Sequence, residues 1–321
     1  LLDTIPKPEA KRVDGCGWKH KHFDAGPGLL QLLYPAILSE DPYAVKAYIA
    51  FRHDPLLSLP DPEAQKKAFD KLDLVVAIDA NYSETGWYAD VLLPSATYLE
   101  KSSVLTTGKG LKPQFGLRKQ AVEPRNDAKP DWWIFKSLAE RLGAGEYFKF
   151  KDMEEFWQWQ LEDTGVTVSD LEKKGFVALT DKPVWWNRME DLKFKTPSKK
   201  IEFVSSRLEA SGIESFKPYK SPKKPEEGYY RLAFGRSPVH THGRTQNNPV
   251  LSEIMPENQL WLNDEEAGKL GVANGDRVRV TSADGSHSGT INVYAVSYTH
   301  LTLPTIPFEC SSRGWGDRSR G

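Results

Sequence analysis

The chain has 321 residues, and its 43 basic and 44 acidic side chains give a formal net charge of −1. This balance provides no field that would draw the protein to nucleic acid or to a membrane surface, so no nucleic-acid partner is expected. No apolar run approaches the roughly 20 residues of a membrane-spanning helix. Hydrophobic residues make up 39% of the chain, which is enough for a substantial core, and the length favours two domains of about 150 residues each.

The chain contains two cysteines, Cys16 and Cys310. They are too few for a disulfide framework or for the four thiolates of an iron–sulfur cluster. Cys16 lies between two glycines ahead of the first clear strand, so we interpret it as a packed or solvent-exposed thiol rather than a metal ligand. Residues 1–6 lack the basic start and apolar core of a signal peptide. Because the chain also opens abruptly and without Met, we expect it to be an internal fragment of a longer protein.

Residues 1–44 are rich in Pro, Gly and charge and are predicted to form a connector. An α/β domain over residues 45–225 follows it. This domain begins with a strand over 46–51, a helix over 62–72 and a buried strand over 74–78. A strand, a helix and a strand in this order predict a parallel pair with a right-handed crossover.

Two polar turns follow these strands, over residues 52–55 and 79–86. Because ligands bind outside the carboxyl ends of parallel strands, both turns are predicted to face one crevice. Asp79 has the position of a carboxylate that accepts hydrogen bonds from a guanine base or a ribose. The alternative is that Asp79 caps the next turn, and the residues alone favour neither role.

The next segments are predicted to serve mainly packing. Residues 100–120 form a basic loop that suits a phosphate or a substrate anion, or that is simply solvated. Helices are predicted over 131–142 and 153–161, with their apolar stripes turned inward. Trp185 and Trp186 are assigned to core packing rather than to the lining of a substrate funnel.

A Pro- and Lys-rich linker over residues 217–227 precedes a second domain, which is predicted over 226–296. Short strands separated by Asn-Gly and Asp-Gly turns surround one small helix over 264–270. Many short strands around one helix indicate a small closed β-barrel. The strands are predicted over 231–234, 260–262, 278–281 and 290–294.

The loop over residues 234–248 is the most unusual stretch of the chain. Arg236 and Arg244 have planar side chains that suit phosphate or oxyanion groups. Gly235 and Gly243 allow the backbone to approach a ligand closely. The loop is therefore predicted to bind a polar ligand.

Two histidines of this loop, His240 and His242, are two residues apart. A metal pair on one strand face is one interpretation, but no cysteine or third histidine lies near enough in the sequence to complete a zinc site. A hydrogen-bonded turn between strands and a polar ligand loop are the alternatives, and we favour both over zinc.

The final segment breaks the pattern of the second domain. Residues 296–306 resemble a translated sequencing-library adapter, and residues 311–321 show no core pattern. We therefore expect residues 297–321 to be an artefactual tail without packing partners. His300 and Cys310 are not candidate ligands for this reason.

The loop at 234–248 resembles the start of the C-terminal cofactor-binding domain of molybdenum oxidoreductases that carry two molybdopterin guanine dinucleotides, the dimethyl sulfoxide reductase superfamily. Within that superfamily the chain looks most like the C-terminal half of the catalytic subunit of polysulfide and thiosulfate reductases. The resemblance extends to four further segments, Val75–Asp79, Glu84–Pro94 with Glu100 after it, Lys195–Phe203 and Gly271–Asp276.

The resemblance implies the fold, the cofactor and its contacts. It implies an α/β domain with a parallel sheet of the dinucleotide-binding type, followed by a double-psi barrel. The cofactor is bis-molybdopterin guanine dinucleotide with molybdenum, while a 4Fe-4S cluster and the protein ligand to molybdenum lie in an N-terminal half. Arg244 is a candidate substrate contact. The implied cofactor-binding residues are Arg52, Asp79, Thr85, Gly235, Arg236, His240, His242, Gly243, Thr245 and Gln246.

The same resemblance implies an enzyme of anaerobic respiration that reduces polysulfide or thiosulfate, of which this fragment alone is expected to be inactive. An iron–sulfur electron-transfer subunit and a membrane anchor subunit are the implied partners, and the periplasm is the implied location. The first alternative is a tetrathionate, arsenate or selenate reductase of the same superfamily. The second is a non-catalytic nucleotide-binding module.

Overall fold

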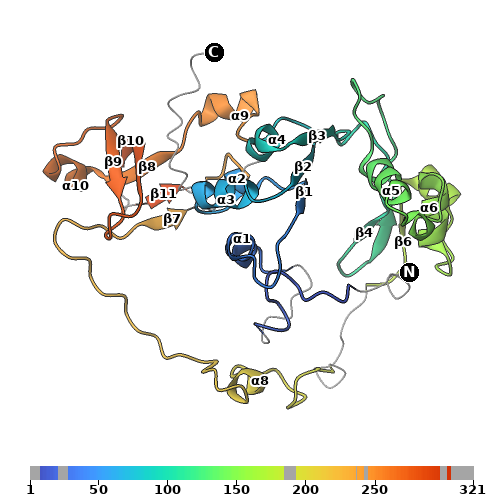
Figure 1. Ribbon diagram of the computed structural model, residues 1–321, viewed down its shortest axis with the longest axis horizontal. Helices are drawn as coiled ribbons and strands as arrows, with labels where there is room; N and C mark the ends of the chain where they lie inside the picture. The colour runs from blue at the N-terminus through green and yellow to red at the C-terminus, as the bar shows by residue number, and fades with distance from the viewer. Residues whose placement is uncertain are drawn as a thin grey trace. The chain divides into compact units, whose positions relative to one another are not determined.

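The computed structural model describes residues 8–20, 28–183, 193–235, 237–241 and 245–296, and the backbone of 302–304 (Figure 1). Contacts divide the chain into two compact units, each described by itself below. One unit comprises Leu1–Ala10, Ile78–Asn81 and Leu92–Tyr219, and the other comprises Lys11–Ala77, Tyr82–Val91 and Lys220–Gly321. The domain boundaries expected at 44, 225 and 296 stay predictions, and Trp185 and Trp186 lie outside the described residues.

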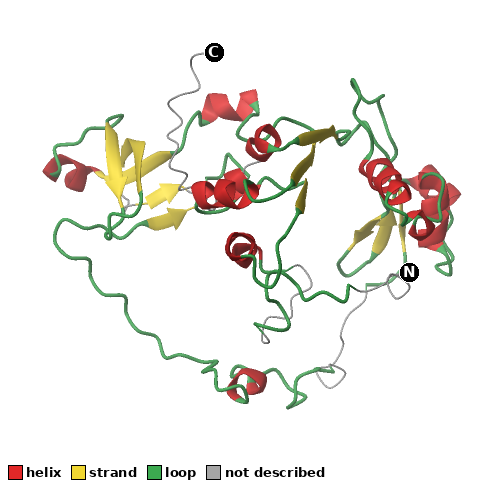
Figure 2. Ribbon diagram, viewed as in Figure 1, coloured by secondary structure: helices red, strands yellow, loops and turns green. Residues whose placement is uncertain are grey.

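A three-stranded sheet is formed by β1 (Ala47–Phe51), β2 (Leu74–Asp79) and β3 (Val91–Pro94), in the order β1-β2-β3 (Figure 2). The start of β1 meets the start of β2, because the carbonyl oxygen of Lys46 accepts from the amide of Leu74 at 3.2 Å. The start of β2 also meets the start of β3, since Asp90 N–H donates to the Val75 carbonyl at 2.9 Å. The predicted parallel sheet is therefore confirmed.

Helices α1 (Leu30–Ser39), α2 (Pro55–Ser58) and α3 (Pro62–Phe69) pack with β2. The shared core contains Tyr34, Ile37, Leu56, Ala68, Phe69 and Val75. The connector expected over 1–44 is therefore wrong for residues 30–39, which form a helix of this core. The reason is that Tyr34 and Ile37 lie one helical turn apart and bury one face together.

The basic loop expected over 100–120 folds into an antiparallel hairpin. Strands β4 (Thr106–Gly108) and β5 (Gln114–Gly116) pair with each other, and β5 pairs in turn with β6 (Phe176–Ala178). Sequence separation hid this sheet, because β5 and β6 are 60 residues apart in the chain and no local pattern joins them.

Helices α5 (Asp131–Arg141), α6 (Met153–Leu161) and α7 (Val168–Lys174) and the 3-10 turn η2 (Gly145–Tyr147) accompany this sheet. The two predicted helices are confirmed, and α5 ends one residue before the predicted bound at 142. Pro130 is its N-cap residue and makes no side-chain cap, while the Asp131 carboxylate pairs with Lys101. Leu142 follows the last helical residue and is 79% exposed.

The C-terminal sheet has the order β7-β11-β8-β10-β9. Its strands are β7 (Ala233–Gly235), β8 (Gln259–Asn263), β9 (Arg277–Thr281), β10 (Ser288–Val296) and β11 (Thr302–Pro304). Strands β8 and β10 are parallel, and β9 and β10 are antiparallel. Helix α8 (Ser206–Glu209) precedes the sheet in the chain, while α9 (Pro249–Ile254) and the expected α10 (Asp264–Lys269) lie between β7 and β9.

This sheet is open among the described residues, because β7 and β9 are its edges and do not pair with each other. A closed double-psi barrel therefore stays a prediction. The tail expected to lack packing partners does have them at residues 302–304, whose backbone pairs with both β7 and β8. The expectation for 297–321 is wrong for these three residues, since backbone pairing does not depend on the composition that suggested an accidental sequence.

We predict that Leu171→Ala destabilises the hydrophobic core beside the sheet of β4, β5 and β6. Leu171 is fully buried against Leu105, Trp157 and Leu161, and truncating such a leucine costs about 2–5 kcal/mol of unfolding free energy. Urea and thermal unfolding measure this cost. Leu142→Ala, at the exposed end of α5, is the matched control and should change stability little; equal losses in both variants would contradict this assignment of the core.

Candidate functional site

The turn after β1 contains a backbone conformation that favours glycine but is occupied by arginine. Arg52 has a φ of 52°, which an L-residue adopts only where its surroundings hold it there. Its side chain is exposed, and the guanidinium carbon lies 6.0 Å from the ring centroid of Phe51. The turn thus presents a cation at the carboxyl end of a parallel strand, the edge at which such sheets bind ligands.

The carboxylate of Asp54 joins this turn to helix α4 (Glu84–Tyr88). Thr85 donates to Asp54 Oδ1 twice, from its backbone N–H at 3.0 Å and from its hydroxyl at 2.6 Å. The backbone N–H of Leu56 donates to Thr85 Oγ1 at 3.3 Å. We call this set of contacts the Asp54–Thr85 brace. Thr85 is fully buried, so its hydroxyl serves the brace in this chain, and its direct contact with cofactor stays a prediction.

His53 was not singled out from the sequence, although it lies between Arg52 and Asp54. Its Nε2 atom is buried and has no hydrogen-bond partner among the described residues. Leaving such an atom unsatisfied costs about 1–3 kcal/mol. Burial lowers the pKa of His53 from its usual value, and the nearby Asp54 carboxylate opposes that shift. The signal available in the sequence was a histidine placed directly after a strand.

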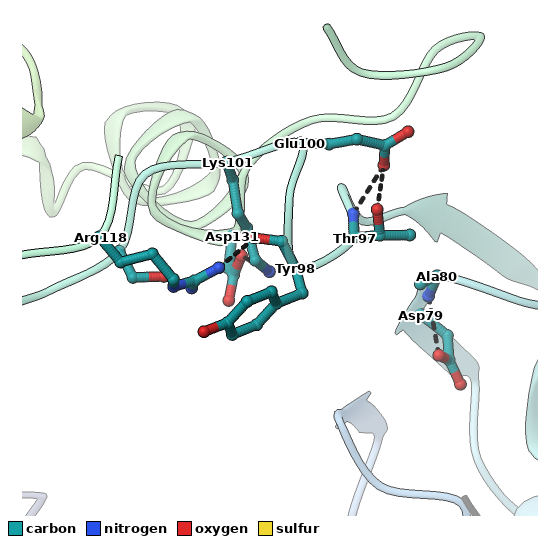
Figure 3. Close-up of polar contacts among 9 residues, drawn as sticks. Asp79, Ala80, Thr97, Tyr98, Glu100, Lys101, Arg118 and Asp131 are labelled. Carbon is teal, nitrogen blue, oxygen red and sulfur yellow. Dashed lines mark hydrogen bonds and ion pairs between the residues drawn. The ribbon is translucent and has the colours of Figure 1, made fainter. Parts of the chain in front are cut away.

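Asp79 ends β2 and belongs to the other compact unit. Its Oδ1 accepts from the amide of the next residue, Ala80, at 2.7 Å, and its carbonyl accepts from Ser95 N–H at 2.9 Å. Figure 3 shows the carboxylate pointing away from Thr97. Helix α4 is capped by Ser83, which accepts from Gly86 N–H. Asp79 therefore does not cap that helix, and its role as a nucleotide contact stays a prediction.

Glu100 fixes the backbone that follows β3. Its carboxylate accepts from the amide and hydroxyl of Thr97 at 2.8 and 2.7 Å (Figure 3). It also accepts from Arg125 N–H at 3.0 Å. These hydrogen bonds, led by the Thr97 hydroxyl, hold the pKa of Glu100 below its usual value. Glu100 is buried, so this carboxylate organises a turn rather than facing a substrate.

The basic side chains of the same region are also engaged. Arg118 lies over the ring of Tyr98 at 3.8 Å and donates to the Tyr98 carbonyl and the Ser103 hydroxyl. Lys101 pairs with Asp131 (Figure 3). Lys101 and Arg118 thus hold segments of this unit together, and an anion would have to compete with these contacts to bind either side chain.

The polar loop of the C-terminal domain is anchored to Met255, which follows α9. His240 Nε2 lies 2.9 Å from the Met255 carbonyl oxygen, so it carries a proton and donates. Ser237 donates its hydroxyl proton to Met255 Sδ at 3.0 Å. We call these two contacts the Met255 clamp. His240 is buried, and in this chain it positions the loop; its cofactor contact stays a prediction.

Thr245 closes the same loop, since its hydroxyl oxygen accepts from Thr241 N–H at 2.9 Å and lies 3.4 Å from His240 Nδ1. The Gln246 carbonyl accepts from the Ser252 hydroxyl at 2.8 Å, and Gly235 ends β7. The remaining predicted contacts lie outside the described residues. These are Arg236, His242, Gly243 and Arg244.

The described parts of the chain contain no cluster of three or more His, Cys, Asp or Glu side chains arranged to hold a metal ion. Within the same residues, every helix is too short or too polar to cross a membrane.

We predict that His53 makes the folded chain sensitive to acid. Because burial lowers its pKa, the folded state binds fewer protons at His53 than the unfolded state, in which the value is 6.5. The stabilisation is fully present above pH 6.5 and is lost as pH falls from there toward the folded pKa. The free energy of unfolding, measured with urea at several pH values in this range, should fall less steeply with decreasing pH in His53→Gln than in the wild type. Exposed His287 gives the control, His287→Gln, which should follow the wild type; a wild-type slope in His53→Gln would contradict the prediction.

Two family descriptions match the chain. "Molybdopterin oxidoreductase" matches residues 34–141, which include the Asp54–Thr85 brace, Asp79 and Glu100. "Molydopterin dinucleotide binding domain" matches residues 230–300, which include the Met255 clamp.

Curated relatives and a solved structure also resemble the chain over most of its length. The thiosulfate reductase molybdopterin-containing subunit PhsA of Salmonella typhimurium is 34% identical over 90% of this chain and 41% of that protein. Acetylene hydratase of Syntrophotalea acetylenica is 27% identical over 88% of this chain and 40% of that protein. The structure of acetylene hydratase from Pelobacter acetylenicus shares the fold, with a TM-score of 0.73 and 24% identity over 89% of this chain and 40% of that one.

The chain thus spans about two fifths of the length of these relatives. Relatives at 29% identity include a formate dehydrogenase and a nitrate reductase, so proteins similar to this chain differ in the reaction that their names record. What they share is the family, and the chain belongs to the molybdopterin oxidoreductase family.

Proposed function

We propose that this chain is part of a molybdenum-dependent oxidoreductase that reduces a sulfur compound, thiosulfate or polysulfide. The observation that carries the proposal is the 34% identity to a thiosulfate reductase subunit along 90% of the chain. At 90% coverage this match includes residues of both family segments, 34–141 and 230–300. The dinucleotide-binding match supports a molybdopterin cofactor, and we propose the bis-molybdopterin guanine dinucleotide form.

The residues present fit such a cofactor. A guanine dinucleotide offers phosphate oxygens that accept hydrogen bonds and base and ribose groups that donate them. The β1 turn supplies an exposed guanidinium on Arg52 and a buried His53 Nε2 without a described partner. Asp79, at the end of β2, has a partly exposed carboxylate that by itself suits ribose or guanine donors.

When bound, the molybdenum cofactor supplies the redox chemistry. The chain itself binds and orients the cofactor. We assign Arg52 to phosphate and Asp79 to ribose or guanine, while the Asp54–Thr85 brace keeps the Arg52 turn in its left-handed conformation. Glu100 performs a similar task for the backbone after β3, through its bonds with Thr97 and Arg125.

The loop held by the Met255 clamp is proposed to approach the pterin ends of the cofactors. Gly235 and Thr245 provide backbone and hydroxyl groups at its two ends, and Gln246 provides an amide. Arg236, His242, Gly243 and Arg244 occupy the part of the loop outside the described residues. We assign Arg244 to the sulfur substrate because a guanidinium pairs well with oxyanions.

Partners follow from the relationship to a protein named as a subunit. We propose an iron–sulfur electron-transfer subunit and a membrane anchor subunit as partners, and the periplasm as the location. A 4Fe-4S cluster needs four thiolates, whereas this chain has two cysteines. We therefore assign the cluster to the remaining part of the longer enzyme.

The function is tested on the full-length protein that carries this chain, purified with its molybdenum cofactor. Dye-linked assays should show reduction of thiosulfate or polysulfide at rates well above those for nitrate, tetrathionate, arsenate or selenate. Metal analysis and release of guanine nucleotide check the cofactor. A preparation with full molybdenum occupancy that oxidises formate or reduces only nitrate would overturn the proposed substrate class.

Arg244→Ala in the same protein separates substrate binding from cofactor binding. If Arg244 contacts the substrate, molybdenum content should stay normal while KM for thiosulfate rises or kcat falls about tenfold or more, the effect of losing one charged hydrogen bond. Arg277→Ala, at an exposed position of β9, is the control and should behave as wild type. A loss of molybdenum would assign Arg244 to the cofactor instead, and wild-type kinetics at full occupancy would remove it from both roles.

A further inference from the structure

The β1 turn contains a buried hydrogen-bonding atom that has no partner in the described part of the chain. His53 Nε2 is buried without a partner among the described residues, whereas buried side-chain nitrogen and oxygen atoms of native proteins are paired in the great majority. An unpaired atom of this kind requires an explanation: a strained packing arrangement, a water molecule or a ligand.

The turn itself is not loosely packed. The Asp54–Thr85 brace ties the residue after His53 to α4 through bonds of 2.6 and 3.0 Å. Pro55 and Leu56, which begin α2, are buried. Arg52, the residue before His53, is held at a φ of 52°. Strained backbone clusters at ligand-binding sites, and we therefore attribute the unpaired nitrogen to a ligand rather than to loose packing.

The chemistry of the turn selects the class of ligand. Asp54 is the one carboxylate of residues 52–55, and it is occupied by Thr85. The turn therefore has no free carboxylate to receive the amino groups of a base. It has an exposed guanidinium and an imidazole nitrogen that can donate a proton. Donors without acceptors match the oxygens of a phosphate or diphosphate.

We propose that His53 is a phosphate-binding residue of this chain, donating from Nε2 to the diphosphate of a guanine dinucleotide beside Arg52, with the Asp54–Thr85 brace as the device that positions it. The inference rests on the proposed cofactor and adds to it a residue and a ligand group. The His53 side chain is only partly buried, and in this proposal its ring turns so that Nε2 reaches the ligand. Binding then gives the unpaired nitrogen an acceptor.

The test uses the 321-residue chain labelled with nitrogen-15 in histidine, and guanosine diphosphate as the probe. The His53 ring signals are assigned by their absence from His53→Gln. Millimolar guanosine diphosphate and inorganic pyrophosphate should each shift the His53 Nε2 signal, and guanosine, which lacks phosphate, should not. His287→Gln removes an exposed histidine and should leave the His53 shift intact.

Affinity provides the second measurement. Calorimetry should show guanosine diphosphate binding weakened about tenfold in His53→Gln, as expected for one hydrogen bond to a charged group. Thr85→Val removes the hydroxyl of the brace and should reduce the His53 shift at saturating nucleotide although His53 is still present. A merely structural His53 would leave the nitrogen signal unmoved by any phosphate probe.

Three results would overturn the proposal: nucleotide binding without a change at His53, an equal shift with guanosine, or no phosphate-dependent shift at 10-fold excess over the wild-type dissociation constant or, where no binding is detected, at the highest soluble probe concentration. These outcomes are separate from the fate of the proposed function. A full-length enzyme that contains molybdenum and reduces thiosulfate, while His53 ignores phosphate, would retain the function and remove only this residue.

Discussion

The carboxylate of Asp54 is the contact on which the β1 turn and α4 both depend. Asp54 stands at the position before α2 where an aspartate ordinarily caps its own helix. Here it makes no such cap and instead accepts two hydrogen bonds from Thr85, 31 residues along the chain. Hydrogen bonds to a charged group contribute about 1.5–3 kcal/mol each, and these two tie the β1 turn, which contains Arg52 at positive φ, to helix α4.

The Met255 clamp ties the C-terminal loop to the residue after α9, as the Asp54–Thr85 brace ties the β1 turn to α4. A polar loop with several donors has many conformations, and ordering it costs conformational entropy. Ser237 and His240 reduce that freedom by sharing one residue, Met255, through its sulfur and its carbonyl oxygen. In both places a carboxylate, hydroxyl or imidazole that could serve as a ligand group instead makes contacts within the chain.

The predicted site residues fall into two groups, those that are buried and those that are exposed to solvent. Thr85, Glu100 and His240 are buried and engaged within the chain, whereas Arg52 is exposed and Asp79 partly exposed. We propose that the exposed groups bind cofactor and that the buried ones orient them. Relatives whose names record different reactions match the same segments, which agrees with segments that serve a shared cofactor more than an individual substrate.

Local pattern in the sequence was sufficient for elements whose signal is contained within them. The strands β1, β2, β8, β9 and β10 and helix α6 have periodicities and turn residues that indicate them directly, because side-chain alternation and capping act over a few residues. Asp90 has a structural role, since its carboxylate accepts from Val75 N–H at 2.7 Å. The candidate turns after β1 and β2 followed from the parallel order of the strands.

Tertiary structure alone decided which polar side chains are available to a ligand. No local rule indicates that Asp54 bonds Thr85 rather than its own helix, that His240 bonds Met255, or that His53 is left without a described partner. The same is true of the β4–β6 sheet and of α1, whose partners lie far along the chain. The physical reason is that the residue type determines which hydrogen bonds a side chain can make, whereas packing between distant segments determines which partner it meets.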